Sequence, residues 1–316
     1  MKDKRVWLAA QALVTTILLV LLFRRLDLSV LWAQFVRVPA WFYLLSIALV
    51  LAGQVVYAWR WWLLLTAAGV RIPFANGLRL FFVGTFVNNF LPSTVGGDAA
   101  KIYYIGRDHG YRAVTASVAI DRLLGVGLLA LLAAAALWSS PITAPRLVAA
   151  QVACSAIAVV AIVLLIFTSM GTGGLPARVA RLGDRAVRMA ERLRRLRLDM
   201  AAPLGQPVIV ARAAVVVIGY ALAVTFVYMR FIALQHATVP PFLAMLAVVT
   251  AIAVLSNVPV SFNGLGLREQ LHASLFAPLG ISAEIAVAIS LLLYAQLLLA
   301  SVIGFVLWLQ VRFTGR

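Results

Sequence analysis

The chain has 316 residues, of which 64% are hydrophobic, and its mean hydropathy is +1.02. Soluble domains use about 45–50% apolar residues, so this composition excludes an ordinary soluble enzyme and indicates a polytopic membrane protein. The formal net charge is +17, but the arginines lie in loops between apolar runs, which favours contact with lipid headgroups over binding of nucleic acid. The single cysteine, Cys154, excludes a disulfide framework and a cysteine-based metal site.

Several apolar runs are long enough to cross a bilayer, which takes about 20 residues in a helix. These runs cover residues 6–23, 40–66, 114–137, 146–167, 208–234 and 284–311. The first run follows Lys2, Lys4 and Arg5, as in a signal peptide, but it ends without a small-residue cleavage pattern. We therefore expect it to be an uncleaved first span.

Two further apolar runs, near 78–91 and 242–257, each lead into a break and then a second short, more polar helix. Both breaks, at 88–98 and 256–269, contain asparagine, then proline, then a polar turn with glycines, then an acid. Hydrocarbon offers backbone amides no partners, so a broken helix persists there only where it is buried or lines a cavity. A matched pair of breaks, one in each half of a chain, is typical of a transporter's substrate site.

Basic residues set the expected orientation. The segment 171–207 is rich in arginine, and the positive-inside rule places it in the cytoplasm. Counting spans outward from it places both termini and the segment 101–112 in the cytoplasm as well. The first break then enters and leaves from the cytoplasmic face, and the second does so from the outer face. Arg24, Arg25 and Arg37 disagree with this scheme, because it puts them outside.

The expected fold is an all-α polytopic membrane protein with six full transmembrane helices plus two re-entrant helical hairpins in an inverted repeat. Residues 1–170 form the first membrane half, with a cytoplasmic-face hairpin near 78–105. Residues 208–316 form the second half, with an outer-face hairpin near 242–280. Residues 171–207 form a basic amphipathic cytoplasmic linker between them. The alternative is that both breaks are kinks, which makes eight crossing helices.

Arginines in the linker recur at alternating three- and four-residue steps, which places them on one helical face. They are Arg178, Arg181, Arg185, Arg188, Arg192 and Arg195. An apolar stripe adjoins them, and this pattern predicts a basic helix that lies on an anionic lipid leaflet. A protein-docking helix and a purely topological signal are the alternatives.

The first break supplies a candidate anion site. Gly96 and Gly97 open a short helix, whose free N–H groups and positive dipole end favour a phosphate. Lys101, one turn into that helix, would add a positive charge. The alternative is that Asp98 only caps the helix and Lys101 extends to the interface. Asp121 could form a structural ion pair or accept a coupling proton.

The second break repeats this pattern from the opposite face. Gly264 and Gly266 allow a sharp turn before Arg268 and Glu269. Ionisable groups at membrane depth usually face a partner or a cavity, so this pair is a candidate for substrate contact. The alternative is a pair that only fixes the fold. Arg60, among aromatic residues near the end of a span, is interpreted as an interfacial anchor.

No catalytic or metal-binding pattern accompanies these breaks. The histidines have no ligand spacing, and no nucleophile elbow, P-loop or paired-acid motif is visible. We therefore expect neither enzymatic activity nor a metal or other cofactor.

The breaks resemble the signatures of the lysylphosphatidylglycerol synthase transmembrane-region family, also called flippase-like domain proteins. The first signature is Asn-x-x-x-Pro, a Gly–acid pair and a downstream acid–Arg pair, matched by Asn88, Pro92, Gly97–Asp98 and Asp121–Arg122, with Asp98 where the family usually has Glu. The second, Pro and then Gly-x-Gly-x-Arg-Glu, is matched by Pro259 and Gly264–Glu269. The resemblance implies movement of polar or charged lipids across the cytoplasmic membrane. Without the soluble aminoacyl-transferase domain of two-part members, lipid aminoacylation by this chain alone is not expected.

We therefore expect a flippase or transporter of polar or charged (phospho)lipids in a bacterial inner membrane, with both termini cytoplasmic. Its partners would be membrane lipids with anionic or zwitterionic headgroups. The expected substrate-contacting residues are Asn89, Pro92, Gly96, Gly97, Asp98, Lys101, Asp121, Arg122, Asn257, Pro259, Gly264, Gly266, Arg268 and Glu269. The alternatives are a non-transporting scaffold for a lipid- or glycan-synthesis enzyme, docked through the linker helix, and an intramembrane enzyme acting on a polyprenyl or hopanoid lipid.

Overall fold

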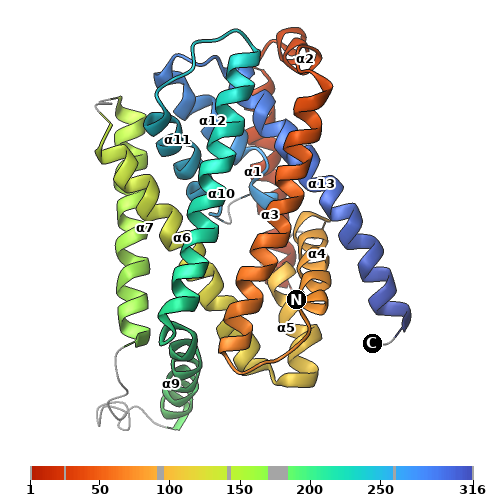
Figure 1. Cartoon of the computed structure of the whole chain (residues 1–316), viewed down its shortest axis with the longest axis vertical. Coiled ribbons are helices and arrows are strands. Elements are labelled where there is room, and N and C mark those ends of the chain that lie inside the picture. The colour runs from red at the N-terminus through yellow and green to blue at the C-terminus, as the bar shows by residue number, and fades with distance from the viewer. Residues whose placement is uncertain are drawn as a thin grey trace.

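The computed structural model describes residues 2–24, 26–90, 96–140, 144–169, 184–258 and 261–314. These residues form helices and no strand, and most of the helices run along the long axis of one bundle (Figure 1). Five of the described helices are long and apolar enough to cross a membrane: α3 (Ala40–Ala67), α6 (Tyr111–Trp138), α7 (Pro145–Ser169), α10 (Pro207–Leu234) and α13 (Ala283–Thr314). This confirms the expected all-α polytopic membrane fold.

The sixth expected span corresponds to α1 (Lys2–Phe23), in which Leu13–Phe23 is apolar. This helix ends near α2 at the upper end of the bundle, and the N-terminus lies in the lower half (Figure 1). The C-terminal end of α13 also lies in the lower half. Both ends of the chain are therefore on the side of the bundle that carries α5 and α9.

Each break separates two short helices, as expected. In the first half α4 (Phe74–Phe90) is followed by α5 (Gly96–His109), and in the second α11 (Phe242–Leu255) is followed by α12 (Leu267–Phe276). Two short 3₁₀ turns, η1 (Phe262–Gly264) and η2 (Ala277–Leu279), flank α12. The α4–α5 pair lies in the lower half of Figure 1 and the α11–α12 pair in the upper half, so the two pairs occupy opposite ends of the bundle.

The two halves of the chain exchange packing partners. Helix α4 of the first pair packs against α13, which follows the second pair. Helix α11 of the second pair packs against α6, which follows the first pair. The helices that precede the two pairs, α3 and α10, pack against each other. Each broken helix is therefore supported by a long helix from the other half.

Helix α11 lies in the main apolar core, and its sequence explains why. It is apolar on every side, and such a helix is stable only where it is covered all round. Met245, Val248 and Ile252 are buried together with Phe231 of α10 and Ile289 of α13. Thr250, within the same stretch, satisfies its hydroxyl by donating to the Leu246 carbonyl at 2.6 Å. Helix α11 is thus the most enclosed short helix among the described residues.

A further short helix, α2 (Leu28–Val36), was not expected from the sequence. Asp27 starts it by accepting the N–H groups of Ser29 and Val30 at 2.8 and 3.2 Å. The hydrogen bond from the Ser29 hydroxyl, together with these amides, holds the pKa of Asp27 below its usual range. Trp32 and Val36 are exposed on α2, as aromatic and apolar residues are on helices at a membrane interface.

Helix α9 (Asp184–Leu204) contains the described part of the basic linker and lies at the lower end of the bundle (Figure 1). It is attached there by an Arg112–Asp199 ion pair of 2.5 Å to the start of α6. Hydrogen bonds from Arg194 and Arg195 lower the pKa of Glu191 to about 2. Arg178 and Arg181 of the predicted basic face lie outside the described residues.

The contact between α4 and α13 predicts a specific sensitivity. A Cβ added to Gly304 would overlap the carbonyl oxygen of Phe82, a backbone atom that cannot move aside. Gly304→Ala should therefore force α13 away from α4 and cost about 1–3 kcal/mol, as overpacked sites do. The measurement is the thermal midpoint of the purified protein in detergent. Gly219→Ala on α10 is the matched control, because a Cβ there meets no atom within 4 Å; equal midpoints would contradict the close packing.

Candidate functional site

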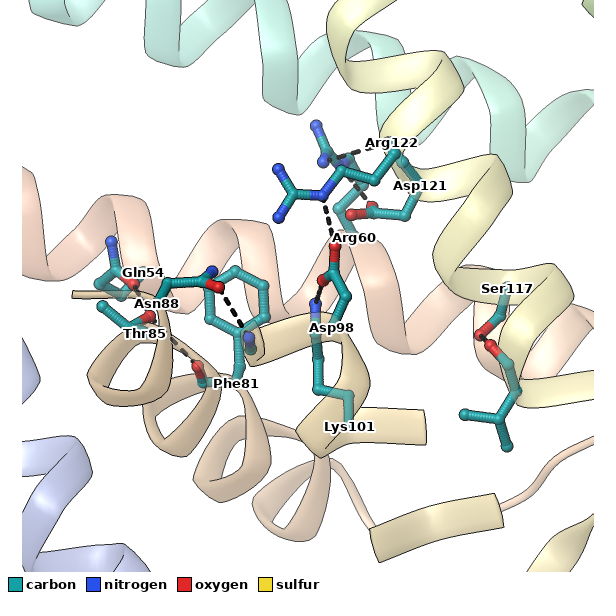
Figure 2. A network of polar contacts seen from close by, with 12 residues as sticks. Gln54, Arg60, Phe81, Thr85, Asn88, Asp98, Lys101, Ser117, Asp121 and Arg122 are labelled. Atoms are coloured by element: carbon teal, nitrogen blue, oxygen red, sulfur yellow. Dashed lines mark hydrogen bonds and ion pairs between the residues drawn. The ribbon is translucent and has the colours of Figure 1, made fainter. Parts of the chain in front are cut away.

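The first charged cluster surrounds Asp98, in the first turn of α5. Lys101, one turn further along, lies 2.7 Å from Oδ1 of Asp98, and Nε of Arg122 donates to Oδ2 at 2.7 Å. Figure 2 shows the carboxylate of Asp98 between these two cations, one from its own helix and one from α6. With one carboxylate and two cations, this cluster carries one unbalanced positive charge.

Lys101 and Arg122 differ in how accessible they are. The Lys101 side chain is 7% exposed, and its ammonium lies over the rings of Trp61 and Phe81 at 4.9 and 5.1 Å from their centroids. The Arg122 side chain is 45% exposed. Cation–π contacts stabilise a desolvated ammonium, so Lys101 is enclosed by the protein whereas Arg122 is open to a ligand. The sequence did not distinguish the two.

Asp121 is adjacent to Arg122 but belongs to a separate pair. Nε of Arg60 on α3 donates to Oδ1 of Asp121 at 2.8 Å, and both side chains are less than a tenth exposed. The guanidinium lies 5.0 Å from the centroid of the Tyr57 ring. Gly125, one turn along α6, leaves room for it, since a Cβ there would lie 3.0 Å from Arg60. Arg60 is therefore a buried partner of Asp121, and its interpretation as an interfacial anchor was wrong.

The junction between α4 and α5 is held by a side-chain hydrogen bond and by a close approach of the two backbones. Oδ1 of Asn88, near the end of α4, accepts the N–H of Gly97 at 2.6 Å. A Cβ on Gly97 would overlap the carbonyl oxygen of Gly84, so only glycine lets α4 and α5 approach this closely. The free amide that was predicted to bind phosphate at Gly97 is thus used by Asn88. Gly96 begins α5 and is partly exposed, and Pro92 lies outside the described residues.

The second cluster surrounds Glu269, in the first turn of α12. Its side chain is fully buried and lies 2.7 Å from Nη2 of Arg268. Oε2 of Glu269 accepts the N–H of Gly266 at 2.7 Å, and Ser290 of α13 donates to Oε1 at 3.1 Å. The Arg268 guanidinium lies 4.4 Å from the centroid of the Tyr294 ring. This pair is electrically balanced, unlike the cluster at Asp98.

A histidine extends this second cluster into α10. Nδ1 of His272 lies 2.7 Å from the carbonyl oxygen of Arg268, and Nε2 lies 2.7 Å from the hydroxyl of Tyr228. A carbonyl only accepts hydrogen bonds, so Nδ1 carries a proton and donates it to this oxygen. The rings of Tyr228, His272 and Phe276 stack on one another. His272 is therefore a fixed member of the core.

The two breaks meet through Asn89, the residue before the last in α4. Its Nδ2 donates to Oγ of Ser301 on α13 at 2.5 Å, and its Oδ1 accepts a hydrogen bond from Asn263 of η1. Asn263 has a positive φ of 43°, a left-handed conformation that asparagine tolerates better than most residues. The tip of each pair is thus bound to the tip of the other.

The remaining predicted residues have local roles. Asn257 donates to the carbonyl of Ala253 within α11 at 2.6 Å, so it terminates its own helix. Gly264 and Gly266 both have positive φ, at 76° and 79°, and make the turn into α12. Gly266 also approaches α1, because a Cβ on it would lie 2.8 Å from Leu18. Pro259 lies outside the described residues.

Several residues of the site were not predicted from the sequence: Arg60, Asn263, Ser290, Tyr294 and Ser301. An arginine within an apolar helix was a signal for Arg60, because such a group requires a partner. The serines and Tyr294 lie in an apolar run and give no such signal. Among the residues that the structure describes, no three His, Cys, Asp or Glu side chains are grouped as metal ligands.

The sequence matches the family described as the lysylphosphatidylglycerol synthase TM region over residues 8–304. The chain belongs to this family. The match includes both breaks, the two charged clusters and the Arg60–Asp121 pair, so the resemblance to the lysylphosphatidylglycerol synthase TM-region family is confirmed.

A more specific similarity covers a shorter part of the chain. The UPF0104 membrane protein PH1989 of Pyrococcus horikoshii is 33% identical over 89 residues. This alignment covers 27% of this chain and 27% of that protein. The relative's name describes it as a membrane protein and states no activity.

The buried Arg60–Asp121 pair predicts strong coupling between its members. Asp121→Ala alone should destabilise the protein by about 3–5 kcal/mol, because it leaves Arg60 buried without its counter-charge. Arg60→Ala combined with Asp121→Ala should cost less than the sum of the single changes. The measurement is a double-mutant cycle of unfolding in detergent.

The exposed Arg107–Asp108 pair is the control for this cycle. Both of its side chains are more than half exposed, and such surface pairs contribute about 0–1 kcal/mol. Additive effects at Arg60 and Asp121, as small as those expected at Arg107 and Asp108, would show that burial does not couple the pair.

Proposed function

We propose that this protein is a transporter that moves a phospholipid with an anionic headgroup across a bacterial cytoplasmic membrane. The observation that carries the proposal is the unbalanced positive charge of the Asp98–Lys101–Arg122 cluster, beside the meeting point of two broken helices. A buried charge without a counter-charge is costly in hydrocarbon. Arg122 is the exposed member of the cluster, so a phosphate can supply the missing negative charge.

The exchange of packing partners supports an inverted repeat. The order α3, α4, α5, α6 has a counterpart in α10, α11, α12, α13, and each broken pair packs on the last helix of the other unit. In the proposed membrane arrangement α4–α5 is a re-entrant hairpin from the cytoplasmic face and α11–α12 one from the outer face. Repeats of this kind rock against each other around a site near the midplane.

Charge distribution supports the orientation. The basic α9 lies at the lower end of Figure 1, as do the connections from α3 to α4 and from α5 to α6. Arg71 lies in the first connection, and Arg107 near the end of α5 and Arg112 near the start of α6 flank the second. The positive-inside rule assigns this end, and with it both termini, to the cytoplasm. Arg122 lies about 17 Å along α6 from Tyr111, at ~1.5 Å per residue, which is deep inside a layer about 30 Å thick.

A headgroup at the hairpin tips would exchange one ion pair for another. Asp98 has two cations, so it keeps Lys101 when Arg122 turns to a phosphate. Asp121 stays paired with Arg60 throughout. Arg268, whose side chain is 18% exposed, would receive the phosphate on the other side of the tip contact, with Glu269 holding it in place. On this proposal the chain binds and moves lipid without catalysis or a cofactor, and its partners are the lipids themselves.

Leaflet exchange tests the proposal. Liposomes that contain the purified protein and fluorescent phosphatidylglycerol should lose outer-leaflet and then inner-leaflet fluorescence when an impermeant quencher is added. The variant with Arg268→Ala and Glu269→Ala should fall to the rate of protein-free liposomes, because the second tip then has no cation.

The matched control removes another adjacent Arg–acid pair, by Arg107→Ala with Asp108→Ala. This pair is exposed on α5, so wild-type exchange is expected. Wild-type protein that exchanges none of phosphatidylglycerol, cardiolipin and phosphatidylethanolamine would contradict transport and favour a scaffold for a lipid- or glycan-synthesis enzyme. Equal loss in both double variants would remove the second tip from the site.

A further inference from the structure

An apolar cavity of about 270 Å³, open to the surface of the bundle, lies between α6 and α7. Its walls include Leu123, Val126 and Gly127 of α6 and Ala156, Val160 and Leu164 of α7. Small side chains at Gly127 and Ala156 leave the space open, and a Cβ on Gly127 would lie 2.8 Å from that of Ala161. Whole small-molecule sites have about 300–1,000 Å³, so this cavity has room for part of a ligand, such as a segment of hydrocarbon chain.

The cavity is adjacent to the unbalanced cation. Val126, in its wall, is four residues after Arg122 on α6, and residues four apart share one face of a helix. Arg122 is therefore one turn before Val126 on the same face of α6. Its Nε binds Asp98, and its side chain is still 45% exposed. An apolar cavity and an accessible cation thus follow each other along one helix face.

From this juxtaposition we infer that the α6–α7 cavity holds an acyl chain of a phospholipid whose phosphate binds Arg122. The inference rests on the proposed function, lipid transport. It extends that function by assigning the part of the substrate site that binds an acyl chain. The excess positive charge of the Asp98 cluster favours a lipid with an anionic headgroup. The residues named in the cavity wall are all apolar, which favours a hydrocarbon chain as the occupant. A free phosphate would satisfy Arg122 but leave the cavity unused.

The acyl-chain site lies at the outside of the bundle, unlike the headgroup site at the hairpin tips. Helix α7 is one of the long apolar helices and exposes Val152, Val159 and Val163 on its surface. A lipid seated between α6 and α7 therefore keeps its second chain in the surrounding bilayer. Only the headgroup and one chain need to contact the protein.

Photo-crosslinking tests the site without requiring transport. The probe is phosphatidylglycerol with a diazirine on one acyl chain, added to the purified full-length chain in detergent, with crosslinks mapped by mass spectrometry. We expect labels on the named cavity residues of α6 and α7, and weaker labelling by diacylglycerol with the same chain. Arg122→Gln should raise the concentration of phosphatidylglycerol needed for competition about tenfold, as loss of one charge-assisted contact does. Arg122→Lys should restore most of it.

Two matched tryptophan variants test the cavity itself. Ala156→Trp fills it from an exposed position and should abolish labelling there. Ile162→Trp adds the same side chain at another exposed position of α7, six residues away and outside the cavity wall, and should label as the wild type does. Size-exclusion profiles and thermal midpoints check that both variants are folded.

Three outcomes would overturn the inference. Labels spread evenly over Val152, Val159 and Val163 would indicate only ordinary contact with bulk lipid. Equal labelling by phosphatidylglycerol and diacylglycerol would remove Arg122 as the phosphate contact, and unchanged labelling of Ala156→Trp would remove the cavity. Wild-type protein that labels as expected but exchanges no lipid between leaflets would support this site and contradict the proposed transport, so the two can fail separately.

Discussion

This structure depends on one constraint: the backbone groups at the interrupted ends of α4 and α11 need hydrogen-bond partners. A helix that stops inside a bundle leaves carbonyl and amide groups without intrahelical partners, and hydrocarbon offers none. Here polar side chains satisfy them. Asn88 accepts an amide of α5, and Ser256 and Asn257 donate to the last carbonyls of α11. The asparagines and serines at the breaks therefore act as partners for backbone groups that the interrupted helices leave without intrahelical hydrogen bonds.

Electrostatics adds a second level of organisation to these ends. Each short helix that follows a break has a carboxylate in its first turn, Asp98 in α5 and Glu269 in α12, where the helix dipole stabilises negative charge. Each carboxylate then pairs with a largely enclosed cation, Lys101 or Arg268. The halves differ in one respect: Glu269 binds one cation and Asp98 binds two. The two short helices thus share the position of their acid but differ in the charge balance of their clusters.

Much of the fold was accessible from the sequence, because an apolar run of about 20 residues has few structures open to it. The bounds of α3, α6, α7, α10 and α13 follow the predicted runs within a few residues. Helix α2 was missed because it is short and its start depends on one capping side chain, Asp27. Arg60 was misread because nearby tryptophans resemble an interfacial belt, whereas its partner lies 61 residues away.

The site was predictable in its residues more than in its contacts. Local patterns identified the acids and the glycines of both breaks, together with Asn88, Asn89 and Asn257. They could not show that Asn89 binds Ser301 and Asn263, which are 212 and 174 residues away. Nor could they rank Lys101 against Arg122, because exposure depends on Trp61 and Phe81 from other helices. Pairing across the bundle is a property of the three-dimensional arrangement alone.

The bond between Asn89 and Ser301 also bears on how the protein is made. Helix α4 is made early in synthesis, but the hydroxyl that completes its tip is 212 residues further along the chain. At about 5–20 residues per second, the ribosome needs roughly 10–40 s to reach it. During that interval the polar end of α4 has no α13 beside it. Until α13 is made, the side-chain amide of Asn89 therefore needs another hydrogen-bond partner.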